Sequence, residues 1–151
     1  FIIGSIGTDA YSNRVREEAS TEQAIEITGL LTRDEIHRVF KKIDVVVCPS
    51  LEDSLPIVAT EAMMYGKICI VSDRTGTANF IEDGENGLIC KAGDPTDLCE
   101  KMKWVMQNRK KLKAMGRKAR KIYEKHFTLD AFGERLEKAL QKAMNGFGSE
   151  P

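Results

Sequence analysis

Short apolar runs rich in β-branched residues alternate with longer amphipathic segments along this chain. The short runs predict strands at residues 1–4, 25–28, 44–48, 68–71 and 87–89. Strands that alternate with helices are typical of a parallel sheet, because each parallel connection has to cross back over the sheet. The pattern therefore predicts an α/β protein with a parallel sheet flanked by helices.

Capping and breaking signals mark where the helices begin and end. Thr32 and Glu35 have the spacing of a capping box, which predicts a helix start. Pro56 fits the first turn of another helix, and Gly66 fits its end. Together the signals predict helices over residues 32–42 and 56–65, a helix from 94, helices over 104–126 and 128–144, and a frayed tail over 146–151.

The length and the charge balance narrow the class of protein. A chain of 151 residues with 42% apolar content suits one domain, which we expect over residues 1–145. The 23 basic and 23 acidic residues cancel, so no global field recruits nucleic acid or an anionic membrane. The basic run over residues 109–121 has helical spacing and no interleaved aromatic residues. This favours a solvated helix face over a nucleic-acid patch.

The cysteines and the apolar segments indicate where the protein resides. Cys48, Cys69, Cys90 and Cys99 show no CxxC pairing, and the first three lie in or beside strand-like runs. This predicts reduced, buried thiols in a cytosolic protein. No apolar stretch approaches the roughly 20 residues of a membrane span. The chain opens at Phe1, inside an expected strand, which favours an excised piece of a longer protein.

The loop after the third expected strand carries the most informative side chains. Ligands of open α/β sheets bind at the carboxyl ends of the strands, and a helix that starts near Pro56 directs free N–H groups toward that edge. A phosphate is expected there. Glu61 can lean back toward the helix start and accept ribose hydroxyls, while Asp53 faces the group on the far phosphate. The spacing alone favours the alternative, two solvated acids near a helix start.

The same segment resembles a known motif. The run Pro-Ser-Leu-Glu-Asp-Ser-Leu-Pro, followed by Glu-Ala-Met-Met-Tyr-Gly, closely resembles the donor motif of the group 1 glycosyltransferases, in which seven residues separate two acids. Asp53 and Glu61 match that catalytic pair, with Asp in place of the first Glu, and the adjacent Glu52 is an alternative for the first acid. The resemblance implies that the donor is bound by Ser54, Leu55, Pro56 and Ile57 as well.

Two further segments resemble the same family. Residues 27–35 are similar to its F-T-G-x-V-x-x-E-E segment, which implies base contacts from Gly29, Leu30 and Leu31; ordinary packing is the alternative. Residues 72–76 are similar to its x-x-x-G-G loop, which implies a donor contact from Gly76. Thr75 replaces the first glycine of that pair.

The resemblance implies the fold, the reaction and the partners. The chain is expected to be the Rossmann-like C-terminal half of a retaining GT-B enzyme. Such an enzyme transfers a hexose from a nucleoside-diphosphate sugar to an acceptor hydroxyl in bacterial-type polysaccharide or glycolipid assembly. No metal or other cofactor is expected. The partner is an N-terminal acceptor-binding domain, which reaches a membrane-surface acceptor at the inner face of the membrane; alone, the chain is expected to bind donor weakly and transfer nothing.

Two other functions remain open from the sequence. The first is one half of a non-hydrolysing nucleotide-sugar 2-epimerase, although such enzymes are not expected to carry the Glu-Ala-Met block at Glu61. The second is a non-catalytic nucleotide-binding α/β module. A receiver-like module would have an acidic cluster after the first strand, where Gly-Ser-Ile-Gly stands instead at residues 4–7.

Overall fold

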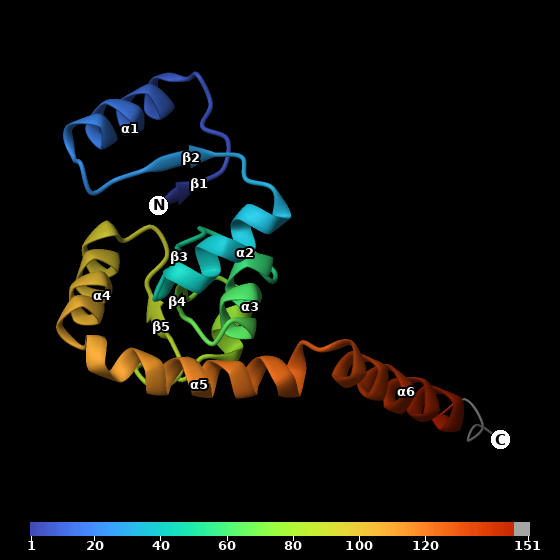
Figure 1. The fold of residues 1–151 in the computed structure, drawn as a ribbon. Coiled ribbons are helices and arrows are strands. Elements are labelled where there is room, and N and C mark those ends of the chain that lie inside the picture. Colours follow the sequence, from blue (N-terminus) through green and yellow to red (C-terminus); the bar gives the residue numbers. More distant parts are fainter. Residues whose placement is uncertain (147–151) are drawn as a thin grey trace. The chain divides into compact units, whose positions relative to one another are not determined.

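A computed structural model describes residues 1–146 of the protein and divides the chain into two compact units. The first unit is Phe1–Lys42, and the second begins at Ile43. Parallel strands flanked by helices make up both units, which confirms the predicted α/β fold (Figure 1). The strands form two separately hydrogen-bonded parallel sheets, one in each unit.

The first unit contains two strands and two helices. Its elements are β1 (Ile2–Ile3), α1 (Ala10–Thr21), β2 (Ile27–Gly29) and α2 (Arg33–Lys42). β1 and β2 pair in parallel, and α1 is the connection between them. The capping box predicted for α2 is confirmed, because Glu35 Oε2 accepts hydrogen bonds from the backbone N–H of Thr32 at 2.8 Å and from its hydroxyl at 2.7 Å.

Helix α1 is absent from the predicted elements because it has no apolar stripe. Its buried residues are only Ser12 and Ala19. The signal that marks it is Asp9, whose carboxylate caps the helix by accepting from the backbone N–H of Ser12 at 3.0 Å and from its hydroxyl at 2.7 Å. These hydrogen bonds lower the pKa of Asp9. Capping, and not periodicity, locates this helix.

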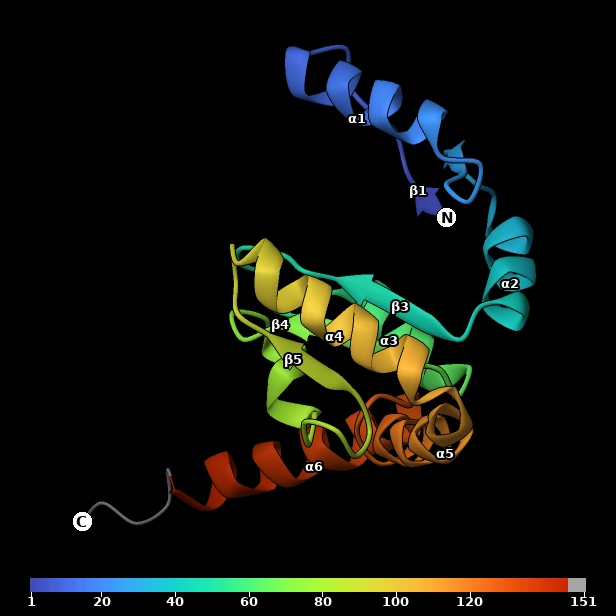
Figure 2. The same ribbon diagram turned by 90° about the vertical axis from the view of Figure 1, so that its left-hand side faces the viewer.

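The second unit is a three-stranded parallel sheet with helices on both faces (Figure 2). Its elements are β3 (Val45–Cys48), α3 (Ile57–Met64), β4 (Ile68–Ser72), a 3₁₀ helix η1 (Gly76–Phe80), β5 (Leu88–Cys90), α4 (Pro95–Gln107), α5 (Arg109–His126) and α6 (Leu129–Gly146). The strand order is β3-β4-β5, and every residue of the central strand β4 is buried.

The two faces of β4 are covered by different helices. Ile68 packs with Leu112 and Met115 of α5, and Ile70 packs with residues of α4. Alternation along a strand turns Cys69 to the opposite face, which is the face that α3 covers. The core is therefore two thin apolar layers, one on each side of β4.

The cysteines follow this layering. Cys69 and Cys90 are buried, Cys48 is half-buried and Cys99 is exposed, and all four are free thiols. Burial raises the pKa of the Cys69 thiol to about 12. Burial, which was expected for the three cysteines near strands, is therefore confirmed for Cys69 and Cys90 and only partial for Cys48.

Two boundaries differ from the prediction. The helix expected over residues 104–126 is two helices, because the backbone N–H of Asn108 and its side-chain amide both donate to the carbonyl of Trp104 and end α4 there. Helix α6 extends to Gly146, past the expected end at Met144. The rest of the predicted frayed tail, residues 147–151, lies outside the described residues.

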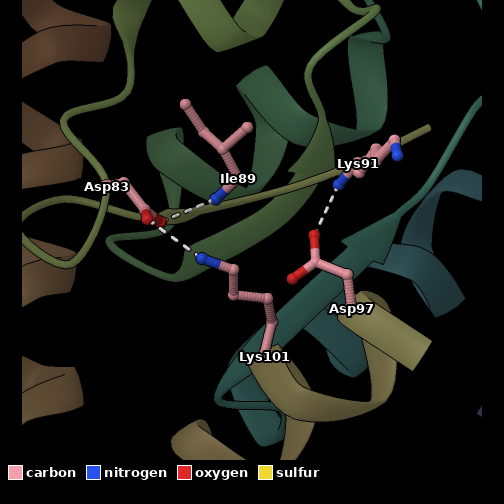
Figure 3. Close-up of polar contacts among 5 residues, drawn as sticks. All are labelled: Asp83, Ile89, Lys91, Asp97 and Lys101. Carbon is pink, nitrogen blue, oxygen red and sulfur yellow. Dashed lines mark hydrogen bonds and ion pairs between the residues drawn. The ribbon is translucent and has the colours of Figure 1, made fainter. Parts of the chain in front are cut away.

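Two carboxylates accept hydrogen bonds from the backbone N–H groups at the outer edge of β5 (Figure 3). The backbone N–H of Ile89 donates to Asp83 at 2.9 Å, and that of Lys91 donates to Asp97 at 2.6 Å. Asp83 also forms an ion pair with Lys101 of α4 at 3.0 Å. Because both edge donors are satisfied by side chains, this edge does not offer a template for another strand.

Helix α5 holds the C-terminal end of α3 through a close backbone contact. Gly66 ends α3 as predicted, with a φ of 64°. A Cβ added to Gly116 of α5 would lie 2.0 Å from the carbonyl oxygen of Gly66. The guanidinium of Arg120 donates to the carbonyl of Met64 one turn further along α5. The two helices thus meet at a point that only glycine allows.

The substitution Gly116→Ala tests this contact. Its Cβ forces α5 away from α3, and we expect a loss of about 1–3 kcal/mol in the free energy of unfolding. Gly133→Ala in α6 is the matched control, because nothing lies within 4 Å of its added Cβ and alanine favours a helix by roughly 0.5–1 kcal/mol. Urea unfolding measures both variants; equal stability of the two would contradict the contact.

Candidate functional site

The candidate site is built from the loops that follow β3 and β4. Parallel strands end at the same edge of a sheet, so these two loops are neighbours. The loop after β3 covers residues 49–56 and leads into α3, and the loop after β4 leads into η1. Asp53 and Thr75 form an isolated parallel bridge between the two loops.

Hydrogen bonds tie the two loops together. The backbone N–H of Asp53 donates to the carbonyl of Arg74 at 3.3 Å, and the N–H of Gly76 donates to the carbonyl of Asp53 at 3.0 Å. The hydroxyl of Ser72 donates to the carbonyl of Ser50 at 2.5 Å. The loop after β3 therefore has a fixed backbone along most of its length.

Gly76 is a structural requirement of this arrangement. A Cβ at Gly76 would lie 1.8 Å from the carbonyl oxygen of Ser54. The neighbouring Thr75 is buried, and its hydroxyl donates to the carbonyl of Ser72 at 2.9 Å. The close approach explains the glycine at position 76, whether or not it also contacts a donor.

One of the two carboxylate oxygens of Asp53 accepts a hydrogen bond within the loop. Its Oδ1 accepts a hydrogen bond from the backbone N–H of Leu55 at 3.0 Å, which is an Asx turn. Its Oδ2 has no hydrogen-bond partner within residues 1–146. Asp53 is half-buried, whereas the adjacent Glu52 is exposed. One carboxylate oxygen of Asp53 is thus available to a ligand in a fixed orientation.

The N-terminal end of α3 lacks a side-chain cap. Its N-cap residue is the buried Pro56, which has no side-chain acceptor, and the first turn contains no acidic residue. The backbone N–H of Ala59 donates to the carbonyl of Pro56 at 3.1 Å, but those of Ile57 and Val58 have no acceptor in the described part of the chain. Since the Ile57 side chain is 72% exposed, a ligand can reach this helix end.

Glu61 lies one turn into α3, on the same side of the helix as Ile57. It is half-buried, and its carboxylate has no hydrogen bond or ion pair with any described residue. Side chains of a helix lean toward its N-terminus, so this carboxylate lies on the side of the uncapped N–H groups. That Asp53 and Glu61 bind one donor stays a prediction.

The three candidates for base contacts lie in the first unit. Gly29 ends β2 with a φ of 70°, a left-handed backbone that favours glycine without any ligand. Leu30 is 81% exposed and Leu31 is half-buried. Their contacts with a base stay a prediction.

Two features near the site were missed by the sequence reasoning. Arg74 is exposed and is the sole cation among residues 49–56 and 73–80, and its carbonyl accepts the hydrogen bond from Asp53. Two exposed apolar residues of the same segment, Leu51 and Val58, were also not among the predicted site residues. Arg74 could have been identified only from the pairing of the two loops, and a single sequence does not reveal that pairing.

A cavity of about 210 Å³ lies at the same edge of the sheet, between Pro49 and the start of α4. Its volume is below the roughly 300–1,000 Å³ of typical ligand pockets. Its acid, Asp94, caps α4 by accepting from the N–H groups of Thr96 at 3.0 Å and Asp97 at 3.1 Å. This cavity is therefore not the candidate donor site.

Neither a metal cluster nor a membrane span is found within residues 1–146. No three His, Cys, Asp or Glu side chains there gather closely enough to hold a metal ion. No described helix combines the length and the apolar character that crossing a bilayer requires. The expectation of a metal-free reaction stays a prediction.

Comparisons with known proteins identify the family. The sequence model of the family "Glycosyl transferases group 1" matches residues 1–122. An uncharacterised glycosyltransferase of Methanocaldococcus jannaschii is 30% identical over 101 residues, and the sulfoquinovosyl transferase of Arabidopsis thaliana is 28% identical over 127 residues. These matches cover 67% and 82% of this chain but only 29% and 25% of the two relatives.

Solved structures show the same fold. The Anabaena protein HepE, solved with UDP and glucose, superposes with a TM-score of 0.78 at 18% identity, over 93% of this chain and 39% of HepE. The C-terminal domain of a group 1 glycosyl transferase from Francisella tularensis superposes with a TM-score of 0.69 at 18% identity, over 79% of this chain and 62% of that domain.

The chain therefore has the α/β architecture of a GT-B glycosyltransferase half and belongs to the group 1 glycosyltransferases. The predicted resemblance to the C-terminal half of such enzymes is confirmed. The chain spans less than a third of the relatives named above.

Gly76→Ala tests the contact that shapes the site. Its Cβ cannot coexist with the Ser54 carbonyl, so we expect the loop after β3 to shift and the free energy of unfolding to fall by about 1–3 kcal/mol. Backbone NMR of the variant measures the shift, with Gly133→Ala as the matched control. Unchanged amide signals over residues 53–58 in the Gly76 variant would show that the contact does not hold the loop.

Proposed function

We propose that the second unit binds the diphosphate of a nucleoside-diphosphate sugar at the N-terminal end of α3. The observation that carries this proposal is the uncapped helix end, where the N–H groups of Ile57 and Val58 have no acceptor among residues 1–146, next to a loop whose backbone is hydrogen-bonded. Such a helix end attracts anions through its free donors and its dipole. The Anabaena structures with UDP and with UDP-glucose support a nucleotide-sugar donor for this fold.

The reaction proposed is the transfer of a hexose to an acceptor hydroxyl with retention of the anomeric configuration. As the bond to the sugar breaks, negative charge builds on the departing β-phosphate. The free N–H groups of α3 stabilise that charge by about 0.3–2 kcal/mol through the helix dipole. Ser54, Leu55 and Pro56 set the position of the helix end, and Arg74 is the cation nearest to Asp53 along the paired loops.

The two acids have different roles in this proposal. Glu61, inside the helix, accepts hydrogen bonds from the ribose hydroxyls. Asp53 Oδ2, which has no partner among the described residues, accepts a hydrogen bond from a sugar hydroxyl. The Asx turn at Oδ1 fixes the orientation of the carboxylate. Asp53 is favoured over Glu52 as the first acid, because Glu52 is exposed and has no hydrogen bond to orient it within the described chain.

The rest of the proposed activity depends on more than this chain. We infer that an N-terminal acceptor-binding domain completes the enzyme, because the matched segments make up only 29% and 25% of the two relatives. GT-B sites close between two domains, so the chain by itself binds donor with millimolar affinity and transfers no sugar. We further propose a cytoplasmic enzyme of polysaccharide or glycolipid assembly, working at the inner face of the membrane without a metal or other cofactor.

Glu61→Ala and Asp53→Ala test the division of roles. The ribose is common to UDP and UDP-sugars, so Glu61→Ala should lower the affinity for UDP or GDP about tenfold to a hundredfold. Asp53→Ala should lower the affinity for the free nucleotide much less, because the sugar is absent. NMR-monitored titration of both variants measures the two constants.

Glu52→Ala is the matched control, one residue away and exposed. We expect it to leave nucleotide and nucleotide-sugar affinity unchanged. Equal losses in the Glu61 and Asp53 variants would refute the division of roles. A larger loss of nucleotide-sugar affinity in the Glu52 variant than in the Asp53 variant would make Glu52 the first acid.

A further inference from the structure

Helix α5 concentrates positive charge in a chain whose net charge is zero. Its 18 residues include nine cations and a single acid, Glu124. The nine cations are Arg109, Lys110, Lys111, Lys113, Arg117, Lys118, Arg120, Lys121 and Lys125. The charge balance of the whole chain therefore hides a strongly basic surface.

Four of these cations are engaged with neighbouring groups. Lys118 pairs with Glu85, and Arg109 pairs with Asp44 at 3.4 Å. Arg120 pairs with Glu124 at 2.7 Å, and the Lys111 ammonium lies 5.5 Å from the centre of the Trp104 ring. These four cations are therefore partly neutralised or held by neighbouring side chains.

The other five cations form one exposed stripe. Lys110, Lys113, Arg117, Lys121 and Lys125, here called the cationic stripe, are spaced by three or four residues and have no ion pair within the described chain. They lie opposite the buried face of α5, which consists of Leu112, Met115, Gly116 and Ala119. At 1.5 Å per residue the stripe is about 22 Å long.

A groove adjoins the stripe at the C-terminal end of α3. It has a volume of about 560 Å³ and is lined by Met64, Tyr65, Gly66, Lys113, Arg117, Arg120, Lys121 and Glu124. Four cations and one acid thus surround a space large enough for a phosphate headgroup. This groove lies at the opposite end of α3 from the candidate donor site, about 12 Å away along an eight-residue helix.

We propose that the cationic stripe docks the protein on the anionic headgroups of a phospholipid bilayer. A cluster of four to eight Lys and Arg on one helix face is sufficient for such attraction, at about 1 kcal/mol for each cation near the surface. The apolar face of α5 is buried in the core, so the helix does not insert, and the contact is electrostatic. Docking by this face leaves the N-terminal end of α3 free.

A bilayer fits the stripe better than a nucleic acid does. No aromatic side chain lies among the stripe residues to stack on bases, and no Asn or Gln of α5 is present to contact base edges. A straight row of mostly lysines matches a laterally extended, diffuse negative charge. Binding is therefore expected to fall steeply with salt, because no apolar contact supports it.

Vesicle co-sedimentation of this chain tests the proposal. Vesicles of phosphatidylcholine mixed with phosphatidylglycerol should retain the protein at low salt, and vesicles of phosphatidylcholine alone should not. The variant with Lys110→Gln, Arg117→Gln and Lys121→Gln should partition onto the anionic vesicles roughly a hundredfold less. The matched control, Lys103→Gln with Lys138→Gln and Lys142→Gln, removes the same charge from other exposed positions and should bind nearly as well as the parent.

Two further measurements keep the outcome clear. Circular dichroism should show the same helix content in both triple variants. Their affinities for UDP should equal that of the parent chain. A loss of UDP binding would therefore concern the proposed donor site, and a loss of vesicle binding would concern the cationic stripe. The proposal is overturned if anionic vesicles do not retain the parent chain, or if both triple variants lose binding equally. Binding to duplex DNA without retention by anionic vesicles would also overturn it and assign the stripe to nucleic acid.

Discussion

Two close backbone approaches, each made by a glycine, hold the helix α3 in place. At its N-terminal side, Gly76 lies against the carbonyl of Ser54 in the loop that leads into the helix. At its C-terminal side, Gly116 of α5 lies against the carbonyl of Gly66. A helix of eight residues is too short to be stable by itself, so these contacts and the buried strand β4 fix its position. The candidate donor site and the basic groove both depend on this placement.

Both ends of α3 can attract anions, but through different groups. Within the described residues, the N-terminal end has backbone N–H groups without acceptors, and the C-terminal end is lined by cations of α5. Arg120 donates to the carbonyl of Met64, which is favourable at the negative end of a helix dipole. A phosphate of a donor and a phosphate of a headgroup would thus be bound by different means: backbone donors at one end, and side-chain charges at the other.

The sequence predicted those parts of the fold that local chemistry determines. The capping box at Thr32 and the helix end at Gly66 follow from neighbouring residues, and both were confirmed. Helix α1 was missed because it buries only Ser12 and Ala19, and the break at Asn108 was missed because helical periodicity continues through it. The separation of the strands into two sheets depends on long-range pairing, which no local pattern specifies.

For the site, the motif predicted the loop and the helix, but not how they are held. The roles of Gly76 in loop packing and of Asp53 in an Asx turn follow from contacts across the paired loops. The charge of α5 was visible in the sequence. Which of its cations are free follows only from the positions of Glu85, Asp44 and Trp104.

The most direct test of the donor site is a titration of the ¹⁵N-labelled chain with UDP, followed by two-dimensional NMR. The account predicts that the largest changes in amide chemical shift occur at Ser54, Leu55, Ile57 and Val58, where the N–H groups meet the diphosphate. Unchanged signals there, with the largest changes instead along the cationic stripe or around the cavity at Asp94, would contradict the assignment of the donor site to the N-terminal end of α3.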